Sequence, residues 1–382
     1  MKAYCLNNIS KVALDGLKNP DTVVADIKDC DSILVRSANM LEMDLDNNVL
    51  AVARAGAGVN NIPLQKYADK GVVVFNTPGA NSNAVKELVL CALLLASRDI
   101  IGGNKWVNDN AQDENIAKTA EKAKSQFAGC EIKGKTLAVV GLGVIGVKVA
   151  NACVALGMNV VGYDPYLSIN NAMQLDKNVK YYEKLTDVVK DADYITIHVP
   201  ALDSTKKMIN KEVFDSLNKK AILVNFSRDT LVNEADLKDA LEAGKITKYV
   251  TDFANANVVK LPNTIILPHL GASTEEAEDN CAVMAIDELK DFIENGNVTH
   301  SVNYPDLNAG IKPTDARIAI CHKNIPGIIS SFTTVISSTG ANIENFISKS
   351  KGDYSYSLID VNGKFDITPI EKMDGVLRVR VL

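Results

Sequence analysis

A glycine-rich turn separates an apolar run from a helix-compatible segment. Gly141, Gly143 and Gly146 follow the apolar residues 137–140 and open the segment 144–156. Glycines at this spacing allow a tight turn, a close approach of the backbone to phosphate, and close packing of the helix on the strand. The helix N-terminus also offers free N–H groups to an anion. The pattern therefore predicts a site for the pyrophosphate of a dinucleotide.

An acidic residue indicates which dinucleotide this turn binds. Asp164 follows the predicted strand 159–163 and lies eighteen residues after Gly146, close to the usual distance of about twenty. Its carboxylate can accept hydrogen bonds from both ribose hydroxyls and would repel a 2′-phosphate. We therefore expect NAD rather than NADP. The alternative, an ordinary glycine-rich turn beside a solvated aspartate, does not explain the strand–turn–helix context.

Two further side chains follow predicted strands and could carry out redox chemistry. His269 stands between the strand 264–267 and a Gly-Ala-Ser-Thr turn, and Arg228 follows the strand 221–226. Imidazole can take the hydroxyl proton of a 2-hydroxy acid while hydride leaves C2 for a nicotinamide. Guanidinium can bind the carboxylate of that acid through two parallel hydrogen bonds. The alternatives are a histidine satisfied within its loop and an arginine in a surface salt bridge.

Two α/β series must position these residues. Their apolar runs are continuous rather than alternating, which is typical of parallel strands buried on both faces. The first series has strands at 32–36, 50–54 and 72–75 and a helix at 83–98. The second has strands at 136–140, 159–163, 194–199, 221–226, 248–253 and 264–267, with helices at 144–156, 234–243 and 274–294. This order predicts two Rossmann-like, doubly wound parallel-sheet domains, joined by helix and loop over 103–131.

The pattern changes after residue 296. The segment 297–314 contains two prolines and a glycine and predicts a linker. Beyond it, strands are expected at 317–322, 342–348, 354–361 and 376–382, with a helix at 327–338. The resulting order of strand, helix, strand, strand, helix, strand is that of a small ferredoxin-like βαββαβ domain. We therefore expect an α/β protein with three domains.

The composition describes a globular chain. Of its 382 residues, 47% are hydrophobic and 23% are charged, and the formal net charge is −6. This balance excludes a disordered or collagen-like chain. Lysine and arginine are interspersed with aspartate and glutamate, so no basic surface is indicated, and we expect no nucleic-acid partner.

Targeting segments and cysteine motifs are not evident. The most apolar run, 88–96, is too short to cross a bilayer, and the N-terminus enters a strand-like segment without the apolar stretch of a signal peptide. The seven cysteines are widely spaced and form no CxxC pair, which argues against zinc sites and disulfides. Most, including Cys91, are expected in the core. We therefore expect a cytoplasmic protein with no metal site and no membrane partner.

With these residues in view, further segments resemble a known family. The segments 225–234 (Asn-Phe-Ser-Arg-Asp-Thr-Leu-Val-Asn-Glu) and 267–274 (Leu-Pro-His-Leu-Gly-Ala-Ser-Thr) resemble the active-site signatures of the D-2-hydroxy acid dehydrogenases. Segments 54–61, 76–83 and 198–200 match others of that family, and the resemblance covers essentially the whole chain. Within the family, the chain is similar to members that oxidise D-3-phosphoglycerate to 3-phosphohydroxypyruvate, the first step of L-serine biosynthesis.

The resemblance implies an interrupted order of domains. The substrate-binding domain would comprise residues 1–98 and 283–300, and the NAD-binding Rossmann domain residues 99–282, with the cleft at their junction. A linker over 301–314 would lead to a regulatory ACT domain over 315–382. Members of the family are oligomers, so the resemblance also implies a homo-oligomer.

The resemblance also implies the roles of individual residues. The catalytic positions would be Arg228, His269 and Asn257. NAD would contact Gly141, Gly143, Val144, Ile145, Gly146, Asp164, His198, Val199, Pro200, Ser227, Asp252 and Gly271. The phosphorylated 2-hydroxy acid would contact Arg36, Arg54, Ala55, Gly56, Ala57, Gly58, Val59 and Asn60. In the ACT domain, L-serine would bind across a dimer through His322, Asn324 and Asn342 and inhibit the enzyme.

One position departs from the family pattern. The family carries a glutamate that hydrogen-bonds the catalytic histidine, and here Asn257 stands at that position, twenty-nine residues after Arg228. An amide can orient an imidazole but supplies no charge to stabilise its protonated form. We therefore expect reduction to lose rate at lower pH than in relatives with the glutamate. Two alternatives stay open: a reductase of hydroxypyruvate or glyoxylate, and a weakly active protein that only binds NAD.

Overall fold

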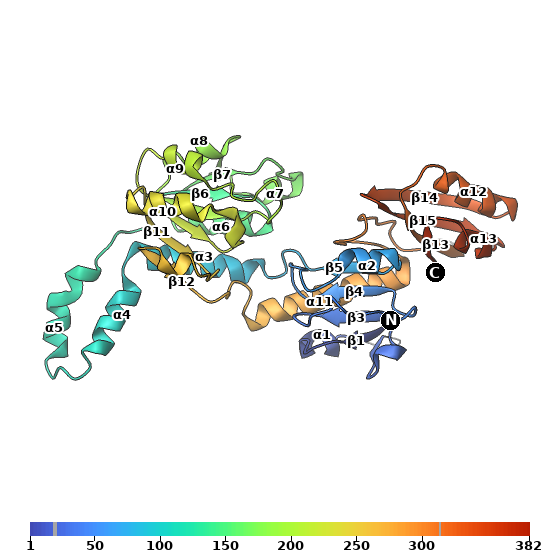
Figure 1. Cartoon of the computed structure of the whole chain (residues 1–382), viewed down its shortest axis with the longest axis horizontal. Coiled ribbons are helices and arrows are strands. Elements are labelled where there is room, and N and C mark those ends of the chain that lie inside the picture. The colour runs from blue at the N-terminus through green and yellow to red at the C-terminus, as the bar shows by residue number, and fades with distance from the viewer. Residues whose placement is uncertain (18–20, 313–314) are drawn as a thin grey trace. The chain divides into compact units, whose positions relative to one another are not determined.

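The computed structural model describes residues 1–17, 21–312 and 315–382 (Figure 1). The chain divides into two compact units. The first joins Met1–Asn81 to Glu275–Leu382, and the second is the continuous segment Ser82–Thr274. The chain therefore leaves the first unit after one sheet and returns to it through a long helix. The domain boundaries implied by the family resemblance remain predictions.

The first unit contains a five-stranded parallel sheet in the order β2-β1-β3-β4-β5. Its strands are β1 (Lys2–Cys5), β2 (Thr22–Val23), β3 (Ser32–Val35), β4 (Ala51–Arg54) and β5 (Val73–Asn76). Every residue of β3 is buried. The strands predicted from continuous apolar runs are confirmed, because helices cover both faces and leave no face for alternating polar side chains.

Helices on both faces complete the core of this sheet. They are α1 (Lys11–Asp15), α2 (Leu64–Asp69) and α11 (Glu275–Asn295), together with the 3-10 turn η1 (Ile27–Asp29). On one face, Phe292 of α11 packs edge-on against Phe75 of β5, with ring centroids 5.5 Å apart. On the other face, Tyr67 of α2 is fully buried with Val52 and Val74. Burial of each such side chain contributes about 1.5–3 kcal/mol.

The second unit is a doubly wound fold with a seven-stranded sheet, ordered β12-β11-β10-β9-β6-β7-β8 and parallel throughout. Its strands are β6 (Thr136–Val140), β7 (Asn159–Tyr163), β8 (Lys180–Tyr181), β9 (Tyr194–Ile197), β10 (Ala221–Asn225), β11 (Ile246–Thr251) and β12 (Thr264–Ile266). The strand order reverses between β6 and β9. Ligands of such sheets bind beyond the carboxyl ends of the strands at this reversal.

Two helical layers enclose the seven-stranded sheet. Their members are α3 (Ser82–Ser97), α6 (Val144–Ala155), α7 (Ile169–Gln174), α8 (Leu185–Val189), α9 (Lys211–Asp215) and α10 (Glu234–Glu242). Helices α3 and α6 pack on one face, and α8, α9 and α10 on the other. As predicted, Asn233 caps α10 by accepting a hydrogen bond from Ala235 N, and Gly244 follows the helix with a φ of +68°.

A helical pair extends from this unit. It consists of α4 (Ile100–Asp109) and α5 (Ile116–Ala123), which Figure 1 shows projecting away from the sheet, followed by the 3-10 turn η2 (Lys124–Phe127). The neighbouring helix α3 corrects one prediction. Cys91 is exposed rather than part of the core, because α3 buries only the face that carries residues such as Val89 and Leu93. Local apolar content did not reveal which face of this helix is covered.

The C-terminal residues form an antiparallel sheet in the order β14-β15-β13-β16, as a βαββαβ domain requires. Its elements are β13 (Ala316–Lys323), α12 (Ile328–Ser338), β14 (Asn342–Lys351), β15 (Tyr354–Asn362), α13 (Thr368–Glu371) and β16 (Val376–Val381). Helices α12 and α13 pack on one face. The predicted α/β fold, with two parallel sheets and a small ferredoxin-like domain, is confirmed.

Residues 297–312, the described part of the segment predicted as a linker, are packed within the first unit. Val298 and Leu307 exchange backbone hydrogen bonds of 2.8 Å in both directions. Tyr304 is fully buried, and its hydroxyl donates to Ala68 O at 2.7 Å. The opposite face of the C-terminal sheet joins the same core through Tyr356. Residues 313–314 of the predicted linker lie outside the described residues.

Candidate active site

The glycine turn after β6 has the geometry that a phosphate cradle needs. Gly141 has a φ of +95°, and a Cβ atom there would collide with His198 O. A Cβ atom at Gly146 would collide with Gly141 O, so this glycine permits the contact between α6 and the turn. A Cβ atom at Gly143 would meet nothing within 4 Å. The turn is therefore closed toward the protein and open at the helix N-terminus, where Val144 and Ile145 begin α6.

Asp164 is held at the end of β7 by two backbone groups. Its Oδ2 accepts a hydrogen bond from Leu142 N at 2.8 Å, and its Oδ1 accepts one from Tyr166 N at 2.8 Å. The carboxylate is half-buried. Each oxygen keeps a second lone pair, so the fixed carboxylate can still accept hydrogen bonds from ribose hydroxyls.

His198 supports the turn from β9 as a neutral ring. Its Nε2 lies 2.9 Å from Thr196 Oγ1, and its backbone N donates to Val140 O at 2.7 Å. Burial lowers the pKa of His198 to about 3, because an imidazolium would lose its hydration. The predicted contacts Val199 and Pro200 continue from the same strand end. At neutral pH this edge therefore gains no charge from His198.

Asp252 is a buried carboxylate with one oxygen unused. It is 1% exposed, and its Oδ2 accepts a hydrogen bond from Gly271 N at 3.1 Å. Its Oδ1 has no partner within the described part of the chain. Burial raises the pKa of Asp252, while the nearby His269 acts in the opposite direction. A buried acceptor without a donor is costly, so this position suits a ligand with an N–H group, such as the carboxamide of a nicotinamide.

Phe253 brings the two expected catalytic side chains together. The His269 ring lies 4.7 Å from the Phe253 ring, centroid to centroid, at an interplanar angle of 48°. The guanidinium carbon of Arg228 lies 5.8 Å from the same centroid. Arg228 is further held by the hydrogen bond that its Nη1 donates to Ser227 O at 2.6 Å. Arginine and imidazole therefore share one loop cluster at the carboxyl ends of β10, β11 and β12.

Asn257 does not orient His269 in this structure. Its Nδ2 donates to Glu234 Oε2 at 2.8 Å, and Asn255 Nδ2 donates to Glu234 Oε1 at 2.7 Å. Across residues 1–17, 21–312 and 315–382, the His269 ring nitrogens form no hydrogen bond. Asn257 and Glu234 instead line a cavity of about 690 Å³. The sequence analysis did not predict a role for Phe253 or for Glu234. Phe253 directly follows Asp252, which was predicted to contact NAD.

Several residues expected to bind the substrate lie in the first unit. Arg54 Nε donates to Arg36 O at 3.1 Å. Ala55 is buried and its N–H bonds Val35 O, whereas Gly56 has a φ of +149° and opens the loop 56–60. Within the described chain, the N–H groups of residues 57–60 form no backbone hydrogen bond. These N–H groups could donate hydrogen bonds to a bound anion.

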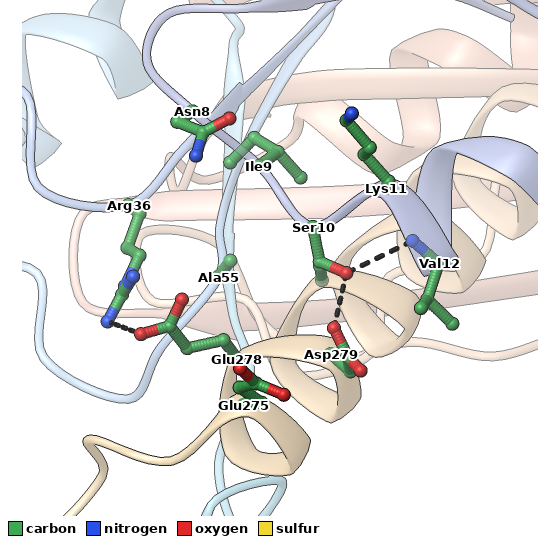
Figure 2. A pocket seen from close by; sticks show the side chains of 11 residues that line it. Asn8, Ile9, Ser10, Lys11, Val12, Arg36, Ala55, Glu275, Glu278 and Asp279 are labelled. Atoms are coloured by element: carbon green, nitrogen blue, oxygen red, sulfur yellow. Dashed lines mark hydrogen bonds and ion pairs between the residues drawn. The ribbon is translucent and has the colours of Figure 1, made fainter.

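A cavity of about 470 Å³ borders this region (Figure 2). Arg36 and Ala55 line it, and Figure 2 shows the Arg36 guanidinium directed at Glu278 of α11, with 2.6 Å between Nη2 and Oε1. Asp279, the next residue of α11, accepts a hydrogen bond from Ser10. The first turn of α11 therefore places carboxylates beside an expected anion-binding arginine, a feature that sequence reasoning also missed.

The expected effector residues are not gathered within one C-terminal domain. His322 is 1% exposed, and its ring nitrogens lie 2.9 Å from Ser357 Oγ and 2.9 Å from Lys323 O. Asn324 is exposed and bonds Gly352 O at 3.1 Å. Asn342 pairs with the far end of β15, whereas His322 pairs with its beginning. At about 3.3 Å per residue, the two ends lie roughly 23 Å apart.

The described residues offer neither a metal centre nor a membrane-spanning helix. Among them, no group of three or more His, Cys, Asp or Glu side chains is arranged to hold a metal ion. None of the helices in residues 1–17, 21–312 and 315–382 combines the length and the apolar content needed to cross a membrane.

The chain is similar to known dehydrogenases over most of its length. The family described as "D-isomer specific 2-hydroxyacid dehydrogenase, NAD binding domain" matches residues 90–271. The D-3-phosphoglycerate dehydrogenase of Haemophilus influenzae is 30% identical over 389 aligned residues, which cover 97% of this chain and 90% of that protein. The protein of the same name from Methanocaldococcus jannaschii is 33% identical over 79% of this chain, and the match spans only 57% of that protein.

Solved structures show the same fold. An NAD+-bound 3-phosphoglycerate dehydrogenase of Entamoeba histolytica superposes with a TM-score of 0.60 at 24% identity, over 80% of this chain and 99% of that one. A D-2-hydroxyisocaproate dehydrogenase superposes with a TM-score of 0.63 at 21% identity, over 79% of this chain and 100% of that one.

Proposed function

The chain belongs to the family of D-isomer-specific 2-hydroxyacid dehydrogenases, and we propose that it oxidises D-3-phosphoglycerate to 3-phosphohydroxypyruvate with NAD. The observation that carries the reaction type is the placement of Arg228 and His269 around Phe253, beside the unpartnered Oδ1 of Asp252. The choice of substrate rests on relatives named D-3-phosphoglycerate dehydrogenase at about 30% identity.

The residues of the second unit fit NAD. The turn at Gly141–Gly146 would hold the pyrophosphate, Asp164 the adenosine ribose, and Asp252 the carboxamide. When bound, NAD supplies an acceptor for the hydride of substrate C2. The fixed carboxylate of Asp164 supports NAD over NADP, because a 2′-phosphate beside it would be repelled.

The chemistry at C2 needs one proton transfer and one anchored carboxylate. In oxidation, an imidazole nitrogen of His269 takes the hydroxyl proton, and in reduction the same nitrogen returns it. Arg228 binds the substrate carboxylate and stabilises negative charge on the C2 oxygen as it develops. Because His269 is exposed, it can also exchange its proton with solvent.

In the first unit, Arg54 and the N–H groups of residues 57–60 are our candidates for the substrate phosphate. Arg36 is a weaker candidate for binding the phosphate, because its Nη2 already forms an ion pair with Glu278 Oε1 at 2.6 Å. This ion pair is about two-fifths exposed on both sides, so water and salt screen it and an incoming anion can displace the carboxylate.

The C-terminal domain supports a proposal of regulation by L-serine. Asn324 and Asn342 are exposed but lie near opposite ends of β15. One serine molecule could therefore contact both only across two copies of the domain, which agrees with an expected homo-oligomer. His322 would have to exchange its contact with Ser357 or Lys323 to take part. Calorimetric titration with L-serine tests this, and an absence of heat of binding would reject it.

A spectrophotometric assay separates the proposed activity from its alternatives. We expect the protein to oxidise NADH with 3-phosphohydroxypyruvate at a higher kcat/KM than with hydroxypyruvate or glyoxylate. A preference for either unphosphorylated acid would identify a different reductase of the family. NADH binding without turnover of any of the three acids would identify a protein that only binds the cofactor. This outcome is tested because Asn257 replaces the glutamate of the family.

A further inference from the structure

The ring of Phe253 contacts both side chains to which the proposed reaction is assigned. It lies 4.7 Å from the His269 ring and 5.8 Å from the guanidinium carbon of Arg228. We infer that Phe253 is the positioning residue of this pair and takes over the orienting task for which the family uses a glutamate. This inference rests on the proposed dehydrogenase function.

The carboxylate that contacts Asn257, that of Glu234, forms no hydrogen bond with His269 in the described structure. Glu234 accepts hydrogen bonds from Asn255 and Asn257 on its two oxygens. Asn255 Oδ1 in turn accepts the backbone N–H groups of Asn257, at 3.0 Å, and Val258, at 2.9 Å. The loop 255–258 is therefore tied to the start of α10 and not to His269. The contact that can orient the His269 ring is therefore the one with the Phe253 ring.

The backbone leading into Phe253 is fixed by two hydrogen bonds, so its ring can hold neighbouring side chains in place. The Phe253 N–H donates to Thr251 Oγ1 at 3.2 Å, directly after β11 ends. The preceding Asp252 is buried and held by Gly271 N. Phe253 itself is half-buried, at the open edge where Arg228 and His269 lie. A side chain anchored by a strand end and by its neighbour holds its partners more precisely than a free loop side chain does.

The aromatic face also matches the charge that His269 carries during the cycle. An aromatic face is electron-rich and attracts a cation within about 6 Å of its centroid. The protonated imidazole formed in oxidation gains this attraction, which a neutral imidazole does not. The charged groups near His269 are the carboxylate of Asp252 and the guanidinium of Arg228, which lies near the same phenyl ring. The Phe253 ring is therefore within reach of both the imidazole of His269 and the guanidinium of Arg228.

Replacement of the ring tests the inference with the holoenzyme. The variants are Phe253→Leu, which removes the ring, Phe253→Met, which keeps volume without a ring, and Phe253→Tyr, which keeps the ring. With NADH and 3-phosphohydroxypyruvate, we expect Phe253→Leu and Phe253→Met to lower kcat about tenfold. The KM for NADH should change less than about twofold. The pH at which reduction falls to half its rate should drop by about half a unit, and Phe253→Tyr should restore most of both effects.

A matched control removes another half-buried ring of the same unit. Phe127 packs against Trp106 with centroids 6.2 Å apart, in the projecting helical pair. Phe127→Leu should leave kcat and the pH profile unchanged. Wild-type kcat and pH profile in Phe253→Leu or Phe253→Met would overturn the inference. An inactive wild-type protein would instead reject the proposed function, so the two failures are distinguishable.

Discussion

Asn257 donates its amide hydrogen to Glu234 Oε2 across 2.8 Å, and this contact binds the position of the family glutamate to helix α10. As a consequence, His269, our candidate catalytic residue, has no carboxylate partner at position 257. A glutamate placed at position 257 would face Glu234 at hydrogen-bond distance, and two ionised carboxylates repel each other there. We therefore expect that a glutamate at position 257 requires a neutral residue at position 234.

Restoration of the family carboxylate should extend reduction to higher pH. In the double variant Asn257→Glu/Glu234→Gln, the new carboxylate meets a neutral amide and can turn toward His269. We expect its reduction rate to persist about one pH unit higher than in the wild-type protein, because a nearby anion favours the protonated imidazole. The measurement is the pH dependence of kcat/KM with 3-phosphohydroxypyruvate. Glu234→Gln alone is the control, and superimposable profiles for the double variant and wild type would refute this expectation.

Removal of the Asp252 carboxylate should weaken the binding of NAD but not that of ADP-ribose, because only the contact with the nicotinamide is lost. Asp252→Ala deletes the unpartnered Oδ1 that we assign to the carboxamide. A hydrogen bond to a charged group contributes about 1.5–3 kcal/mol, so the Kd for NAD should rise about tenfold or more. ADP-ribose lacks the nicotinamide, and its Kd should stay within about twofold. An equal loss for both ligands would indicate that Asp252 supports the fold of the site instead.

Asp164 should control the choice between NAD and NADP. In Asp164→Ser, the hydroxyl still bonds a backbone N–H but no longer repels a 2′-phosphate. We expect kcat/KM for NADH to fall and the NADPH-to-NADH ratio of kcat/KM to rise at least about tenfold. Asp176→Ser, a substitution after α7 and outside the turn, is the control. An unchanged ratio in the first variant would contradict the ribose role.

Glu288 should make the protein less stable as the pH rises. Burial raises the pKa of this carboxyl to about 9, so the folded state retains a proton that the unfolded state releases near pH 4.5. The free energy of unfolding is therefore highest below the unfolded value and decreases as the pH rises toward 9. In the protonated form, Glu288 can donate to His300 Nδ1 at 2.7 Å. Urea denaturation at pH 6 and pH 8.5 should show this decrease in wild type but less of it in Glu288→Gln. Equal pH dependence in the two proteins would be inconsistent with a protonated Glu288.

The buried pair Arg317–Asp360 should hold the C-terminal sheet to its neighbours. Arg317 is fully buried, its Nε lies 2.5 Å from Asp360 Oδ1, and its Nη1 donates to Asn295 O and Gly310 O at 2.8 Å each. Arg317→Met leaves Asp360 charged and unpaired, which should cost about 3–5 kcal/mol. The double variant Arg317→Met/Asp360→Leu should recover part of that loss. Chemical denaturation measures both, and strictly additive effects would show that the two side chains do not interact.

Local sequence determined the parts of this protein that depend on neighbours along the chain. The strand ends, the glycine turn before α6 and the N-cap of α10 at Asn233 could be predicted because backbone conformation and capping depend on residues a few positions apart. The candidate site residues Asp164, Arg228 and His269 could be selected because each lies within three residues of a strand end. Their strand ends meet at one edge of the sheet, as the parallel fold requires.

Tertiary structure decided what depends on residues far apart in the chain. The commitment of Asn257 to Glu234, the pairing of Arg36 with Glu278, and the contact of Phe253 with His269 each join separate elements. The packing of 297–312 and the exposure of Cys91 likewise depend on which surfaces other elements cover. Side-chain partners are selected by distance and burial in space, and a sequence pattern specifies neither until the sheets and helices have packed.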